Sequence, residues 1–109
     1  MEPLLDRLHL VDKHIARAVA ATEANADTSP ITRAVVREFQ RKMKKASDSL
    51  TASSSARDKR DAVIEVEQAG DSAVVAATAD TSLTDDARKA IEVAHKAICL
   101  LKFEGGYET

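Results

Sequence analysis

The 109-residue chain has very few of the residues that give most small proteins their bulky cores and covalent cross-links. Aromatic residues make up 3% of it, namely Phe39, Phe103 and Tyr107, and tryptophan is absent. With so few aromatic residues, the core has to be built mainly from Leu, Ile, Val and Ala, which suits helices that pack closely side by side. The single cysteine, Cys99, excludes an internal disulfide and favours a reducing compartment, so we predict a cytoplasmic location.

Long apolar runs are also missing. The two longest, "AVVAA" and "AICLL", have five residues each, far fewer than the ~20 that a membrane-spanning helix needs. The first segment, "MEPLLDRLHLVDKH", meets charges at Glu2, Asp6 and Arg7, which interrupts the apolar region that an export signal requires. We therefore expect neither secretion nor a membrane partner.

The chain is instead rich in apolar residues at helical spacing. Four such stretches cover about residues 3–24, 30–50, 62–77 and 85–103. The first two stripes run through Leu4, Leu8, Val11, Ile15, Ala18 and Thr22, and through Ile31, Val35, Phe39, Met43, Ala46 and Leu50. The third runs through Ala62, Val63, Val66, Ala69, Ala73, Val74 and Ala77, and the fourth through Ile91, Ala94, Ile98 and Leu101.

Helix start signals precede these stretches. Ser29 before Pro30 predicts an N-cap followed by the favoured first helical residue. Thr84 predicts another cap, before two aspartates that suit the positive end of a helix dipole. The Ser-rich segment 51–56 allows two alternatives: a loop ending in a cap at Ser55, or one continuous helix from the second stripe into the third.

Small residues at positions 69, 73 and 77 of the third stripe predict a close helix–helix contact, although Gly70 inside it costs about 1 kcal/mol relative to alanine. With loops this short, neighbouring helices should run antiparallel. The sequence therefore predicts one all-α domain over 1–104, an antiparallel up-down-up-down four-helix bundle that is dimeric, followed by a flexible C-terminal tail over 105–109.

Charge is unevenly distributed along the chain. Residues 33–60 carry a net charge of +6 and the rest −8, which together give the chain's −2. Five cations on the second helix form what we call the basic ridge: Arg33, Arg37, Arg41, Lys44 and Lys45. Solvation is a sufficient explanation for such a ridge, and binding of an anion or nucleic acid is the functional alternative. The acidic total and the scarcity of aromatics argue against nucleic acid.

The last helix is apolar over more than one face. Val93 and Leu100 lie off its core stripe, and Leu10 lies off the stripe of the first helix. A helix that is apolar most of the way round is central in a fold or is covered by a partner. We call Leu10, Val93 and Leu100 the apolar patch, and we predict that it forms a homo-oligomer or protein-partner interface.

His95 is the most interesting single residue, because it lies beside the apolar stripe and one turn before Cys99. The pair supplies two of the four ligands of a structural zinc site, and no second cysteine exists, so the sequence predicts no metal and no cofactor. Histidine phosphotransfer at His95 is a remote alternative, since Ile98 and Cys99 stand where a phosphate-binding pair would be needed.

No grouping of nucleophile, base and oxyanion donors is visible, so the sequence predicts no catalytic residue and no enzyme. The leading prediction is a non-enzymatic helical-bundle protein that acts through protein–protein interaction and self-association. The alternative is anion or nucleic-acid binding through the basic ridge.

Overall fold

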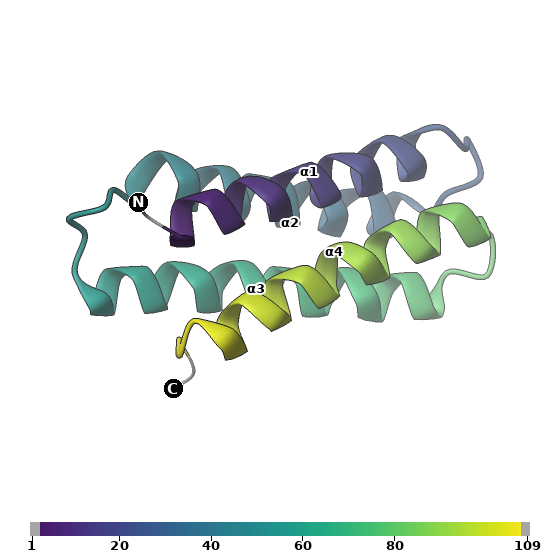
Figure 1. Cartoon of the computed structure of the whole chain (residues 1–109). Coiled ribbons are helices and arrows are strands. Elements are labelled where there is room, and N and C mark those ends of the chain that lie inside the picture. The colour runs from purple at the N-terminus through teal and green to yellow at the C-terminus, as the bar shows by residue number, and fades with distance from the viewer. Residues whose placement is uncertain (1–2, 108–109) are drawn as a thin grey trace.

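The computed structural model describes residues 3–107, which form four α-helices and no strand. The helices are α1 (Pro3–Glu23), α2 (Pro30–Ser49), α3 (Ala56–Ala79) and α4 (Asp85–Glu104). They pack against one another in a ring, because α1 and α3 each contact both α2 and α4. Figure 1 shows them lying along the longest dimension of a molecule that measures 43 × 22 × 18 Å. The prediction of an all-helical four-helix fold is confirmed.

Two of the three connections lie at the same end of the molecule. Figure 1 shows the α1–α2 and α3–α4 connections together at one end, and the α2–α3 connection at the other. Hydrogen bonds to the carboxylate of Asp80 tie the paired connections together: the Ser29 amide donates at 3.0 Å and the Thr32 hydroxyl at 2.8 Å. Ser82 also donates its hydroxyl to the carbonyl of Asp27, at 2.8 Å. Two segments that are distant in sequence are thus joined by polar contacts.

The predicted caps begin the helices as expected. Ser29 accepts from the amide of Ile31, Ser55 from that of Asp58 and Thr84 from that of Ala87. Of the two alternatives for residues 51–56, the loop is correct, since α2 ends at Ser49 and α3 begins at Ala56. Each cap satisfies an amide that has no partner within its own helix.

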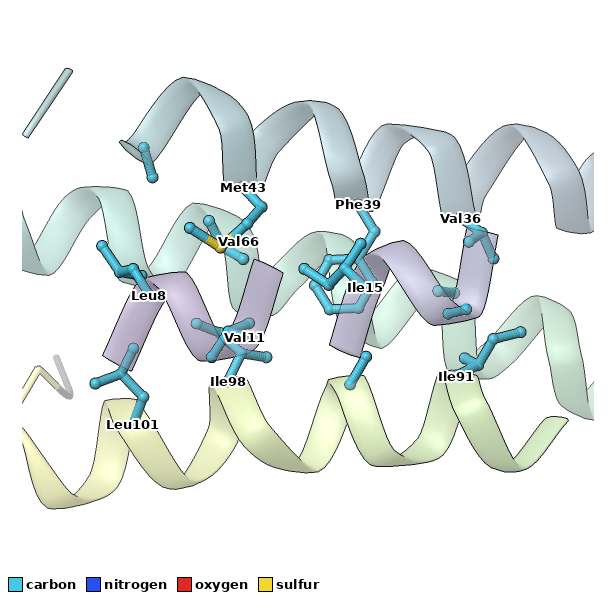
Figure 2. Packing of buried hydrophobic residues seen from close by; sticks show 14 of the residues in the cluster. Leu8, Val11, Ile15, Val36, Phe39, Met43, Val66, Ile91, Ile98 and Leu101 are labelled. Carbon is cyan, nitrogen blue, oxygen red and sulfur yellow. The ribbon is translucent and has the colours of Figure 1, made fainter. Parts of the chain in front are cut away.

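The core is aliphatic, with Phe39 as its one fully buried aromatic. Figure 2 shows Leu8, Val11 and Ile15 of α1 meeting Phe39 and Met43 of α2 and Ile91, Ile98 and Leu101 of α4. Val63, Val66, Ala73 and Ala77 of α3 complete the cluster. The stripes predicted for α1 and α4 are fully buried.

The stripe predicted for α2 is wrong at its first two positions. Ile31 is 70% exposed and Val35 is only partly buried, whereas Thr32 and Val36 are buried. Ile31 lies in the first turn of α2. Thr32 takes the inward position there because its hydroxyl reaches Asp80 of the neighbouring connection, a partner that periodicity cannot reveal.

Gly70 is itself part of the close helix contact predicted for α3. A Cβ atom at this position would lie 3.0 Å from Cζ of Phe39 and 3.2 Å from Cδ2 of His95. The buried small residues of α3 are therefore Gly70, Ala73 and Ala77, while Ala69 is only partly buried. The missing side chain makes room for the one large ring in the core and brings α3 close to His95.

α4 ends in a Schellman motif. Gly105 is the C-cap, and Gly106 has a φ of 71°, which favours glycine. The amide of Tyr107 donates to the carbonyl of Lys102 at 2.9 Å and that of Gly106 to Phe103 at 3.3 Å. Tyr107 packs against the core. Flexibility of the tail stays a prediction, and residues 108–109 lie outside the described part of the chain.

Within residues 3–107, none of the helices combines the length and the apolar character needed to cross a lipid bilayer.

Candidate functional site

Four side chains of metal-binding type meet between α3 and α4. They form what we call the ligand cluster: Glu67, Asp71, His95 and Cys99. One ligand atom from each lies within 4.8 Å of the ligand atoms of the other three. Nε2 of His95 is 2.6 Å from Oδ1 of Asp71 and 3.5 Å from Sγ of Cys99. Sγ of Cys99 is 4.0 Å from Oε2 of Glu67.

The helical repeat explains why these side chains converge. Glu67 and Asp71 are one turn apart on α3, and His95 and Cys99 are one turn apart on α4, so each pair lies on one helix face. The packing of α3 against α4 then sets the two pairs against each other. His95 lies over Gly70, where a larger residue would contact its ring.

The cluster is accessible to solvent but is partly enclosed. The side chains of His95 and Asp71 are 26% and 52% exposed, and that of Glu67 only 13%. Burial, and then the negative charges of Glu67 and Asp71, raise the pKa of the Cys99 thiol. Lys102 opposes this shift, and its Nζ lies 3.4 Å from Oε1 of Glu67. The thiol is therefore protonated at neutral pH and is not the activated thiolate of a nucleophilic cysteine.

His95 is thus more than a residue at the edge of the core. Its Nε2 atom faces a carboxylate and a thiol, and a second carboxylate lies behind the thiol. Two carboxylates beside this nitrogen would repel a phosphoryl group, which disfavours the phosphotransfer alternative.

Sequence reasoning found half of this cluster. The pair His95 and Cys99 is visible on its own helix, but Glu67 and Asp71 come from a segment 24–32 residues earlier. The signal that was missed is a second pair of ligand residues, also one turn apart, on the neighbouring helix. Recognising it requires knowing which faces of α3 and α4 meet.

The residues of the basic ridge all lie on α2, but their partners lie on two different sides of that helix. Arg33 is turned toward the α1–α2 connection, where its guanidinium donates to the carbonyl of Asn25 at 2.7 Å and its Nε atom is buried. Nε of Arg37 donates to Glu23 of α1 at 2.6 Å. On the other side of α2, Lys45 lies 3.2 Å from Glu65 of α3.

The remaining ridge residues lie between these two sides. Arg41 makes two hydrogen bonds to Glu38 of its own helix, and they lower the pKa of that carboxylate. Lys44 is exposed and lines a shallow hollow together with Arg37, Arg41 and two aspartates. Most of the ridge is therefore paired with carboxylates or carbonyls of the same chain, and its positive charge is largely compensated locally.

The apolar patch is exposed in this structure. Leu10 is 56%, Val93 41% and Leu100 43% exposed. Arg7 of α1 and Glu104 of α4 form an ion pair at 2.7 Å, which connects these two helices. Farther along the same pair of helices, His14 and Val93 line one shallow hollow.

Comparison of the chain with protein-family models, with curated proteins and with solved structures finds no match. Its function is therefore inferred from the ligand cluster, the basic ridge and the apolar patch.

Proposed function

We propose that this protein is a non-enzymatic helical bundle that acts through protein–protein interaction, and that its first partner is a second copy of itself. The single observation that carries the proposal is the exposure of the apolar patch. Of the six large apolar side chains that are exposed in the described part of the chain, four lie on α1 and α4: Leu10, Val93, Leu100 and Phe103. A concentration of this kind on two neighbouring helices is typical of an interaction surface.

The proposal includes an antiparallel up-down-up-down arrangement within each subunit. Three ion pairs between neighbouring helices support it. The start of α1 meets the end of α4 through Arg7 and Glu104, and the end of α1 meets α2 through Glu23 and Arg37. Lys42, in the second half of α2, lies 2.5 Å from Glu65 in the first half of α3.

The order of residues along the outer face of α4 suits pairing with a second, antiparallel copy of the same helix. Lys89, Val93, Leu100 and Glu104 lie within about 60° of one another around the helix axis. Val93 follows Lys89 by four positions, and Glu104 follows Leu100 by four. Two antiparallel copies of α4 would therefore place Val93 opposite Leu100 of the other copy and Lys89 opposite Glu104. A two-fold interface needs this kind of self-complementary order.

Lys96 lies midway along this stretch of α4, at the edge of that face and level with the proposed two-fold axis. It is exposed, and in the dimer it would approach the same residue of the second copy. Like charges near an axis weaken association. The substitution Lys96→Ala should therefore strengthen the dimer, which a surface unrelated to self-association would not do.

Size-exclusion chromatography with light scattering tests the proposal at micromolar concentration. We expect a dimer for the unchanged chain and a monomer for the double variant Val93→Glu, Leu100→Glu. Val75→Glu is the matched control, because Val75 is 69% exposed on α3, outside the proposed interface. Far-UV circular dichroism checks that each variant is helical. A strict monomer for the unchanged chain would overturn the proposal.

Anion binding through the basic ridge is the second candidate. The observation in its favour is that Arg37, Arg41 and Lys44 line one hollow, and the observation against it is that Asp12 and Asp48 line the same hollow. Titration with labelled duplex and single-stranded DNA and RNA, at low and moderate salt, separates the two candidates. Phosphate contacts weaken steeply with salt, so an absence of binding even at low salt eliminates this alternative.

The proposal assigns no catalytic role and places the protein in the cytoplasm. The raised pKa of Cys99 supports the first part, because a protonated thiol is a poor nucleophile. The single free cysteine supports the second, because a lone thiol persists in a reducing compartment.

A further inference from the structure

We propose that the ligand cluster is a zinc-binding site, in which one Zn²⁺ ion is held by Nε2 of His95, Sγ of Cys99 and one carboxylate oxygen each from Glu67 and Asp71. The site lies between α3 and α4, whereas the proposed self-association uses the outer face of α4 and Leu10 of α1. The two proposals can therefore succeed or fail separately.

The donor set is the first argument. One imidazole nitrogen, one thiolate sulfur and two carboxylate oxygens are all ligand types that Zn²⁺ accepts in four-coordinate sites. The sulfur and nitrogen donors disfavour Mg²⁺ and Ca²⁺, which prefer six or more oxygen ligands. The cluster is thus more specific than a group of surface carboxylates.

The distances are the second argument. Bonds of about 2.0–2.3 Å to a tetrahedral zinc ion place the ligand atoms about 3.3–3.8 Å apart. Sγ of Cys99 already lies 3.5 Å from Nε2 of His95, and it is 4.0 Å from Oε2 of Glu67. The 2.6 Å hydrogen bond between His95 and Asp71 has to open to admit the ion, and ligand atoms that lie up to 4.8 Å apart have to draw together around it. Asp71 is half exposed and free to make this adjustment.

The charge balance is the third argument. Binding of the ion displaces the proton of the Cys99 thiol, and the buffer accepts this proton. The four ligands then carry three negative charges, one each on Cys99, Glu67 and Asp71. The complex with Zn²⁺ has one net negative charge, and the ammonium of Lys102 beside Glu67 compensates it.

Four protein ligands leave no open coordination position, so the site is structural rather than catalytic. It would join α3 to α4 next to Gly70, where a Cβ atom on α3 would lie 3.2 Å from the ring of His95. This role fits a bundle whose α3 is lined by small residues and offers few large apolar contacts.

The test uses the full-length, reduced chain and Co²⁺ as a spectroscopic substitute for Zn²⁺. We expect a thiolate-to-cobalt charge-transfer band and the strong visible bands of four-coordinate Co²⁺, saturating at one ion per chain and displaced by Zn²⁺. Calorimetry at about pH 8, in buffers of different ionisation enthalpy, should show release of about one proton per Zn²⁺ bound. The melting temperature should rise with Zn²⁺ concentration.

Conservative variants identify the ligands. Cys99→Ser should abolish the charge-transfer band, and His95→Gln, Glu67→Gln and Asp71→Asn should each weaken Zn²⁺ binding at least tenfold. His14→Gln and Glu92→Gln are matched controls outside the cluster and should leave binding unchanged. All replaced side chains reach the surface at least in part, and circular dichroism without metal checks that each variant folds.

Two results would overturn the proposal. One is the absence of a charge-transfer band at millimolar Co²⁺ with the thiol demonstrably reduced. The other is binding that survives Cys99→Ser and His95→Gln but is lost in His14→Gln. Either result would show that the four side chains form a surface ion-pair and hydrogen-bond cluster only.

Discussion

Replacing Gly70 by alanine tests how closely α3 approaches Phe39. In a helix interior, this change normally stabilises by about 1 kcal/mol, since alanine loses less conformational freedom on folding. Here the new Cβ would lie 3.0 Å from Cζ and 3.3 Å from Cε1 of Phe39. The ring is fully buried in the core.

The expected magnitude follows from these two opposing effects. Overpacking a filled core costs about 1–3 kcal/mol, and the helix preference for alanine returns about 1 kcal/mol. Gly70→Ala should therefore lower the free energy of unfolding by about 1 kcal/mol. In a Phe39→Leu background, the ring atoms of Phe39 that meet the new Cβ are gone and the 3.2 Å approach to Cδ2 of His95 remains, so the same change should be close to neutral. The predicted coupling energy is about 1–2 kcal/mol, within the range seen for residues in contact.

Urea unfolding monitored by far-UV circular dichroism measures the four free energies of this double-mutant cycle. Protein concentration is held fixed and metal is chelated, because association and metal binding both change apparent stability. Ala16→Gly supplies the control: Ala16 is exposed on α1, so its cost should simply add to that of Phe39→Leu. Additive free energies for Gly70→Ala and Phe39→Leu would refute the inferred contact.

Three further predictions concern the loops and the surface. Asp80→Asn should destabilise the protein at neutral pH, because Asp80 accepts hydrogen bonds from Ser82, Thr32 and Ser29 that lower its pKa from 3.8 to about 2. A lowered pKa stabilises the fold above pH 3.8, and this contribution is lost as the pH falls toward 2. The difference between Asp80→Asn and the unchanged chain, measured by thermal melting, should therefore shrink over that range, and a constant difference would contradict the assignment. Thr84→Ala should cost about 1 kcal/mol in urea unfolding by removing the cap of α4, and Thr84→Ser should restore most of it. Arg37→Glu combined with Arg41→Glu should leave the circular dichroism spectrum unchanged, because both side chains are about two-thirds exposed; loss of helicity would mean that these residues stabilise the core.

The sequence alone was sufficient to predict the helices and most of what each one buries. Helix positions depend on a 3.6-residue period and on caps that act within three residues, and both are local properties. The caps at Ser29 and Thr84 are confirmed for this reason, and the cap at Ser55 is the correct one of the two alternatives for residues 51–56. Sequence reasoning failed at Ile31, because Thr32 is buried instead. The hydroxyl of Thr32 donates to the carboxylate of Asp80, which is distant in the sequence and does not enter the periodicity.

What only the tertiary structure decided is which helix faces meet. The basic ridge looked continuous along the sequence, but in the fold its members turn to Glu23 on one side and Glu65 on the other. The ligand cluster exists because one turn of α3 lies against one turn of α4, and His95 rests on Gly70. Such pairings depend on the angle and register at which two helices pack. Those quantities are set by side-chain contacts summed over the whole core, and no local pattern in either helix contains them.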